Sequence, residues 1–234
     1  MNHSPLHEKV VVIIGASRGI GKATADLLSD YGTKLILGSR NMITSEKKSP
    51  NILLLTVDVS NEDSVIDFVN KSITHFGKID VLINAAGLGT FSPVLESKTS
   101  DFDQMMNVNL RGTYLTCKFF GRQMKKQGNG QILNLISIAG TTALAGSGGY
   151  AASKFGLLGL TRVLQTELRG EGVRITSILP GAIDSSFWDG MDHQFDRTKM
   201  IPVQSIAKQI IFLINQPGDS VVDEIAIMPL DGIL

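Results

Sequence analysis

The feature that most constrains the fold is a regular alternation between short apolar runs and longer segments with helical periodicity. The runs, mostly Val, Ile and Leu, cover residues 10–14, 34–37, 52–57, 81–84, 131–136, 174–179 and 225–228. The helical segments cover 19–31, 61–76, 101–126, 151–168 and 204–215. Runs that are apolar throughout are typical of parallel strands covered on both faces. The alternation therefore predicts an α/β fold, a Rossmann-like doubly wound parallel sheet of about seven strands with helices on both faces.

The length and composition narrow the class of protein. No repeat, low-complexity tract or linker divides the 234 residues, so we expect residues 1–234 to form a single domain. Lys and Arg number 22, as do Asp and Glu, and this balance argues against a nucleic-acid partner. No apolar stretch reaches the roughly 18 residues that span a membrane, and the run 10–14 is too short for a signal peptide. We therefore expect a cytoplasmic protein without a membrane partner.

Neither histidine nor cysteine predicts a metal site. The four histidines, His3, His7, His75 and His193, are scattered and lack the spacing of metal ligands. Cys117 is the single cysteine and lies in an apolar helical segment, where a buried, unreactive thiol is the better prediction.

A glycine-rich segment, Gly15-Ala16-Ser17-Arg18-Gly19-Ile20-Gly21, joins the first predicted strand to the first predicted helix. Glycines permit a tight turn and a close approach of the backbone to a pyrophosphate, whose charge then meets the helix N-terminus. The spacing is G-x-x-x-G-x-G and not the commoner G-x-G-x-x-G. A purely structural turn is the alternative, but the strand before it and the helix after it favour dinucleotide binding.

The end of the second predicted strand bears on the choice of nucleotide. NAD-binding sites usually carry an acidic residue there, which binds the ribose 2′-hydroxyl. Here the strand ends in Gly38-Ser39-Arg40, and no Asp or Glu occurs between Tyr31 and Ser45. Arg40, helped by Arg18, suits a 2′-phosphate. Both arginines could instead be solvated surface charges, but with the acid missing the pattern favours NADP(H).

Tyr150 and Lys154 are four residues apart in a predicted helix, so they lie on one face, one turn apart. A free tyrosine titrates near pH 10 and is a poor acid or base at neutrality. A cation about 4 Å away at an effective dielectric of about 20 is worth up to about 4 kcal/mol. Lys154 should therefore lower the Tyr150 pKa by about one to three pH units. The pair alone is a weak signal, because such pairs occur by chance in many helices. Ser137 at the end of a buried strand, Asn109 inside the preceding long helix and the glycine loop strengthen it.

Together these motifs resemble the short-chain dehydrogenases/reductases, in their compact single-domain branch, from Lys9 to Gly232. Besides the glycine loop, the resemblance rests on Asp58-Val59, Asn84-Ala85-Ala86-Gly87, Asn107-Val108-Asn109-Leu110, Tyr150 with Lys154, and Pro180-Gly181. Within the family the chain is similar to 3-oxoacyl-carrier-protein reductases and carbonyl reductases. Two departures are Ile14, where the family often has Thr, and Ala85, where it has a second Asn; neither touches a catalytic group.

The resemblance implies a role for each site residue. Tyr150 is the general acid/base, and Lys154 lowers its pKa and binds the nicotinamide ribose. Ser137 hydrogen-bonds the substrate oxygen, and Asn109 holds a water that links Lys154 to solvent. The implied cofactor contacts are Gly15, Ser17, Arg18, Gly19, Ile20, Gly21, Ser39, Arg40, Asp58, Val59, Asn84, Ala85, Ala86, Gly87, Tyr150, Lys154, Pro180, Gly181, Ile183 and Ser185.

Residues 186–202 are the expected substrate loop. Its apolar residues either form a pocket wall or simply anchor the loop to the core, and the sequence favours neither interpretation. They are Phe187, Trp188, Met191, Phe195 and Met200. His193 is a weak candidate for a general acid. The helical segments 101–126 and 151–168 resemble those that pair subunits in the family, which implies a homodimer or homotetramer.

The predicted function is an NADP(H)-dependent oxidoreductase acting on a small-molecule carbonyl or secondary alcohol. Two alternatives stay open. One is a sugar or polyol dehydrogenase of the same family, and the other is a non-catalytic NADP(H)-sensing protein, because a fold does not determine a function.

Overall fold

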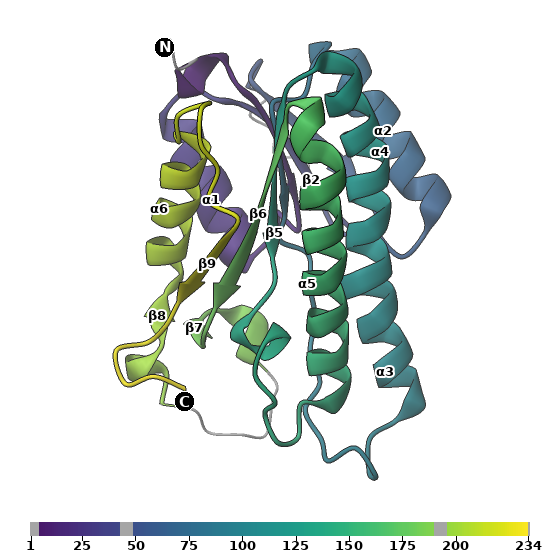
Figure 1. The fold of residues 1–234 in the computed structure, drawn as a ribbon, viewed down its shortest axis with the longest axis vertical. Coiled ribbons are helices and arrows are strands. Elements are labelled where there is room, and N and C mark those ends of the chain that lie inside the picture. The colour runs from purple at the N-terminus through teal and green to yellow at the C-terminus, as the bar shows by residue number, and fades with distance from the viewer. Residues whose placement is uncertain (1–4, 43–48, 190–195, 234) are drawn as a thin grey trace.

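A sheet of seven parallel strands forms the centre of the computed structural model, which describes residues 5–42, 49–189 and 196–233 (Figure 1). The strand order is β3-β2-β1-β4-β5-β6-β9, and each neighbouring pair is parallel. The strands are β1 (Val10–Ile14), β2 (Lys34–Ser39), β3 (Ile52–Thr56), β4 (Val81–Asn84), β5 (Gly130–Leu135), β6 (Val173–Pro180) and β9 (Glu224–Ile227). The predicted doubly wound Rossmann-like sheet is confirmed.

Helices cover both faces of the sheet (Figure 1). One face carries α1 (Gly19–Asp30) and α6 (Val203–Ile214). The other carries α2 (Glu62–Phe76), α4 (Thr113–Gln127) and α5 (Gly148–Leu168). Alternate residues of β1 enter two different cores: Val11 and Ile13 pack on the α1–α6 side, and Val10 and Val12 on the α2–α4 side. Because both faces are buried, the strand is apolar throughout.

The predicted helix 101–126 is not one continuous α-helix. It consists of α3 (Thr99–Met105), a π-helical segment (Met106–Gly112) and α4. A Cβ added to Gly112 would lie 2.7 Å from Cγ2 of Val59, so the glycine lets this segment approach the chain after β3. Asn109 lies inside the π-helical segment and is fully buried. Such segments frequently mark functional sites.

Short elements gather where the strands end. Strand β7 (Ile183–Asp184) pairs in parallel with β8 (Ile201–Pro202), and a 3-10 helix covers Ser186–Trp188. Two-residue strands are too short to leave a periodic pattern, so the sequence did not predict them. Figure 1 shows β7, β8 and the C-terminus at the same end of the molecule. The strand order reverses between β1 and β4, and in such sheets ligands bind beyond the carboxyl ends of the strands at that point.

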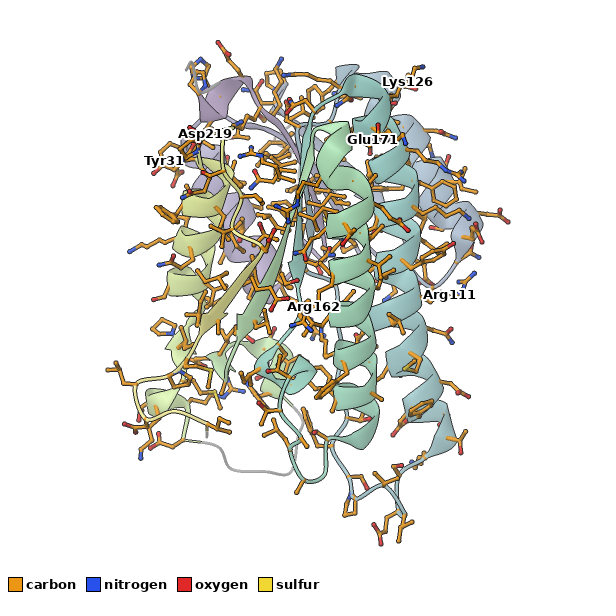
Figure 2. The ribbon with its side chains drawn as sticks, viewed as in Figure 1. Tyr31, Arg111, Lys126, Arg162, Glu171 and Asp219 are labelled. Carbon is orange, nitrogen blue, oxygen red and sulfur yellow. The ribbon has the colours of Figure 1, made fainter. Side chains whose placement is uncertain are left out.

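Side chains fill the space between the sheet and its helices (Figure 2). Ion pairs join exposed side chains on the outside of the molecule. Arg162 of α5 donates two hydrogen bonds to Glu224 of β9, at 2.6 and 3.1 Å. Lys125 of α4 donates to Glu171 at 2.7 Å. Exposed pairs of this kind contribute little, so burial of the two cores accounts for most of the stability. In the part of the chain that the structure describes, no helix is long and apolar enough to cross a membrane.

Candidate active site

A cavity of about 500 Å³ runs along the carboxyl ends of the strands, a size typical of small-molecule sites. Most of the predicted site residues line it, although they come from loops far apart in the sequence. They are Gly15, Ser17, Arg18, Gly19, Ile20, Ser39, Arg40, Asp58, Val59, Ala85, Ala86, Gly87, Ser137, Tyr150, Lys154, Pro180, Gly181, Ile183 and Ser185. The parallel sheet brings them together because its strands all end at the same edge.

The glycine loop fits a phosphate-bearing cofactor. Gly15 has a φ of +86°, and a Cβ on it would lie 2.6 Å from the backbone nitrogen of Ala86. Only glycine therefore allows the loop to lie this close to the chain after β4. The first turn of α1 has neither a side-chain cap nor an acidic residue. Its backbone N–H groups and the helix dipole favour an anion at this position.

The nucleotide end of the cavity carries the charged side chains. Arg18 and Arg40 line it and are exposed, so both guanidinium groups are accessible to an incoming phosphate. Asp58 accepts hydrogen bonds from the Ser60 hydroxyl at 2.7 Å and the Ser60 N–H at 3.0 Å. The hydroxyl is the main reason why the pKa of Asp58 lies below its usual range. The residue is therefore ionised at neutral pH and can accept further hydrogen bonds.

Tyr150 and Lys154 of α5 lie close together in the cavity lining. The Lys154 ammonium donates to the Leu135 carbonyl at 3.0 Å and lies 5.6 Å from the centre of the Tyr150 ring. The Ser137 hydroxyl faces the Tyr150 phenol closely enough to oppose, in part, the rise in its pKa. Burial raises the pKa of Tyr150 to about 12, and it lowers the pKa of Lys154 to about 8.

The expected lowering of the Tyr150 pKa is therefore wrong. That expectation counted the attraction between an ammonium and a phenolate but not the removal of both groups from water. Desolvation disfavours the charged form of each group, so it raises the pKa of the phenol and lowers that of the ammonium. Tyr150 is therefore protonated at neutral pH.

Asn109 holds the chain that follows β4. Its Oδ1 accepts from the Leu88 N–H at 2.9 Å, and its Nδ2 donates to the Leu88 carbonyl at 2.8 Å and to the Ser153 hydroxyl at 3.0 Å. Gly87 fits between this amide and Lys154, since a Cβ on it would lie 3.5 Å from Asn109 Oδ1 and 3.7 Å from Lys154 Nζ. The side chain does not line the cavity itself; it positions the segment that does. The role of Asn109 in holding a water stays a prediction.

The structure does not bring two predicted cofactor residues, Gly21 and Asn84, to the cavity lining. A Cβ on Gly21 would collide with the carbonyl oxygen of Gly15, so this glycine serves the packing of α1 against the loop. Asn84 is 3% exposed, and its side chain points into the core, where its Nδ2 donates to Asn134 Oδ1 at 2.8 Å. Its Oδ1 accepts from the Thr116 hydroxyl at 2.8 Å. Through its side chain Asn84 therefore links β4 to β5 and α4, and its assignment to the cofactor stays a prediction.

Cys117 belongs to the same buried network, with its sulfur 3.4 Å from Asn84 Nδ2. The thiol is buried and desolvation raises its pKa to about 12. The predicted burial of the thiol is confirmed. The raised pKa also disfavours the thiolate, which is the nucleophilic form of cysteine.

Aromatic side chains line the other end of the cavity. Phe187 and Trp188, two of the residues considered for a pocket wall, line the cavity, whereas Met200 is 5% exposed and absent from the lining. Met191, His193 and Phe195 lie outside the described residues. Phe91, which was not predicted, also lines the cavity. Its signal was its place in the loop after β4, four residues beyond the Asn84–Gly87 motif.

Comparisons with known proteins agree with this geometry. Residues 9–195 match the family model of the short chain dehydrogenases. An uncharacterised oxidoreductase of Staphylococcus epidermidis is 33% identical over 95% of this chain and 98% of its own length. Among solved structures, the alcohol dehydrogenase of the archaeon Thermococcus sibiricus, complexed with 5-hydroxy-NADP, is 31% identical over 95% of this chain and 97% of that one, with a TM-score of 0.83. The structure of ElxO with NADP bound is 29% identical over 94% and 97%, with a TM-score of 0.85.

Proposed function

The chain belongs to the short-chain dehydrogenase/reductase family, and we propose that it is an NADP(H)-dependent oxidoreductase acting on a carbonyl or secondary alcohol. One observation carries the proposal: Ser137, Tyr150 and Lys154 line the same cavity as the glycine loop. A cofactor on that loop and a substrate at Tyr150 would thus share one space. Arg18 and Arg40 support the phosphorylated nucleotide, as do the NADP complexes of the Thermococcus enzyme and of ElxO.

When bound, the nicotinamide would supply the hydride for reduction or accept it in oxidation. In the direction of reduction, Tyr150 donates its phenolic proton to the carbonyl oxygen, a step for which a protonated phenol is required. Ser137 donates a hydrogen bond to the same oxygen, where negative charge develops as the carbonyl is reduced. Lys154, with a pKa of about 8, is largely protonated near neutral pH and stabilises the phenolate that remains.

The experiment follows NADPH oxidation with a panel of aldehydes, diketones and 3-oxoacyl thioesters. We expect turnover with at least one of them, and Tyr150→Phe should lower kcat by about 10²- to 10⁴-fold, the usual contribution of a general acid. Tyr31→Phe is the matched control, because Tyr31 is 55% exposed after α1 and lies outside the cavity lining. The kcat values are compared at saturating NADPH, because Tyr150 is also a predicted cofactor contact.

Each alternative has its own result. Full turnover by Tyr150→Phe would refute the acid/base assignment. NADPH binding without turnover of any substrate would favour a non-catalytic sensing protein. NADP⁺ reduction with polyols alone would favour a sugar or polyol dehydrogenase.

We further infer self-association through the helices predicted for subunit pairing. Tyr114 of α4, and Phe155 and Val163 of α5, are 44%, 47% and 53% exposed. Light scattering should give the mass of a dimer or tetramer; the mass of one chain would refute this inference. The cytoplasmic location stays a prediction, and fractionation of cells that produce the protein would test it.

A further inference from the structure

Four aromatic rings meet at the substrate end of the cavity: Phe91, Tyr150, Phe187 and Trp188, which we call the ring cluster. The ring centres of Phe91 and Phe187 lie 5.6 and 5.8 Å from that of Tyr150. Phe91 stacks on Trp188 at 5.7 Å with an interplanar angle of 20°, and Phe187 meets Trp188 edge-on at 5.2 Å. These are the separations of interacting aromatic pairs. The proposed proton donor therefore belongs to an aromatic wall.

The wall is held in place from two sides. The Trp188 indole N–H donates to the Ile183 carbonyl at 2.8 Å, which fixes the orientation of its ring. Next to Phe91, the Ser92 N–H donates to the Gly146 carbonyl at 2.7 Å, so the loop after β4 is tied to the loop before α5. A ring that is already ordered loses little conformational freedom when a ligand packs against it.

Gly89 makes room for the ring cluster. A Cβ on this residue would lie 2.7 Å from Cζ of Phe187 and 3.0 Å from Cδ2 of Tyr150. The absence of a side chain at position 89 is thus what allows Phe187 to approach Tyr150. The close packing of these rings depends on a specific residue choice in the loop.

Charge is distributed unevenly along the cavity. Among its described lining residues, the charged side chains are Arg18, Arg40 and Asp58 at the nucleotide end and Lys154 beneath Tyr150. The loops that carry the ring cluster and Ser137 add the apolar lining residues Leu88, Ile138 and Leu144. A polyol would leave several hydroxyl groups without partners against such a wall, which is costly. A flat apolar group would instead gain ring contacts.

We propose that the substrate carbonyl carries an aryl group, which packs against Phe91, Phe187 and Trp188 while the carbonyl oxygen meets Ser137 and Tyr150. This inference rests on the proposed function and names its substrate class. The reaction is NADPH-dependent reduction of an aryl ketone: the hydride adds to the carbonyl carbon, the Tyr150 proton goes to the oxygen, and an aryl carbinol and NADP⁺ result. Phe91 is the specificity-determining residue.

The test compares three substrates with NADPH: 1-phenylpropane-1,2-dione, pentane-2,3-dione and a ketopentose. The two diketones share a reacting group and differ in the ring. We expect kcat/KM to be at least about tenfold higher for the aryl diketone than for the aliphatic one, the scale on which apolar pockets discriminate. The ketopentose should be the poorest substrate.

Substitution of Phe91 examines the cause of that preference. Phe91→Ala should reduce the ratio of the two kcat/KM values to about twofold or less, since a lost aromatic pair accounts for most of a tenfold difference. Phe91→Tyr keeps the ring and should retain the ratio. Phe212→Ala is the matched control, because Phe212 is 57% exposed on α6 and lies outside the cavity lining. Should Phe91→Ala not fold, Phe91→Leu removes the ring while keeping an apolar side chain.

The fluorescence of Trp188 distinguishes failure of the aryl pocket from failure of the proposed function. It is the only tryptophan of the chain and lines the cavity, so NADPH binding should quench its fluorescence by energy transfer. Turnover with no preference for the aryl diketone, or an unchanged ratio in Phe91→Ala, would overturn the aryl pocket and leave the proposed function standing. A preference for the ketopentose would do the same. Quenching by NADPH without reduction of any substrate would refute the proposed function, and the aryl pocket with it.

Discussion

Substitution of Asn84 by Ala tests whether this residue serves the core or the cofactor. Asn84 Nδ2 donates to Asn134 Oδ1 and its Oδ1 accepts from the Thr116 hydroxyl, both at 2.8 Å. Thr116 also has the Thr113 carbonyl at 2.9 Å and can donate there instead. Asn134 Oδ1 is left with the Cys117 thiol at 3.7 Å, a long contact to a weak donor. The loss therefore falls mainly on a buried oxygen with no good alternative partner.

The expected cost follows from these contacts. Two lost hydrogen bonds contribute about 0.5–1.5 kcal/mol each, and a buried oxygen without a good donor adds about 1–3 kcal/mol. We expect Asn84→Ala to lower the free energy of unfolding by about 2–6 kcal/mol. An unfolding entropy of about 2.1 cal/mol/K per residue, over 234 residues, is about 0.5 kcal/mol/K, so each kcal/mol lowers Tm by about 2 °C. The expected fall in Tm is about 4–12 °C.

The assay measures thermal unfolding by circular dichroism and NADPH affinity by Trp188 fluorescence, the latter well below the transition. Asn84→Ala should lose stability while its Kd for NADPH changes by less than about threefold, within the range of indirect effects. Asn41→Ala is the control with the opposite expectation, because Asn41 is exposed and lines the cavity beside Arg40. An unchanged Tm together with a large loss of NADPH affinity in Asn84→Ala would refute the reasoning and restore Asn84 to the cofactor site.

Two further predictions concern the charged groups of the site. Arg40→Ala should weaken NADPH binding by about tenfold and leave NADH binding within about twofold. Tenfold is the lower end of the loss expected for a charged hydrogen bond, because Arg40 is exposed. Equal losses of affinity in titrations with the two nucleotides would rule out a 2′-phosphate contact. Lys154 has a pKa of about 8 in the folded chain against 10.5 ordinarily, so between these pH values the unfolded chain binds more protons and a rising pH stabilises the fold. Across this pH range the free energy of unfolding of the wild-type chain, measured by denaturant titration, should therefore rise by up to about 3 kcal/mol relative to that of Lys154→Met. Parallel pH curves for the two proteins would contradict a lowered pKa of Lys154 in the folded chain.

The sheet was predictable because burial on both faces leaves a strong mark on the sequence. Strands β1 and β4 have the predicted bounds, since each begins with a continuous apolar run and is followed directly by a loop. Strand β9 lies one residue from its prediction: it pairs with β6 alone at the edge of the sheet, and its residues are only partly buried. Strand β5 is also one residue from its prediction although it is buried throughout, so the ends of a strand are harder to predict than its position.

The features that the sequence did not predict depend on contacts between distant segments. A periodic pattern does not distinguish a π-helical segment from an α-helix, so the interruption of helix 101–126 around Asn109 was not foreseen. Phe91 lies in a loop without periodicity, and only the folded chain brings it to Tyr150 and Trp188. For Asn84, the predicted place at the end of a strand is confirmed, but the side chain of this last strand residue points into the core.

The pKa of Tyr150 connects the site to the direction of the reaction. Burial keeps the phenol protonated at neutral pH, and a proton donor is what reduction requires. Oxidation needs the phenolate, which positive charge near the ring favours, and the oxidised nicotinamide bears a positive charge whereas the reduced form does not. The same tyrosine is thus expected to be an acid when the reduced cofactor is bound and a better base when the oxidised cofactor is bound.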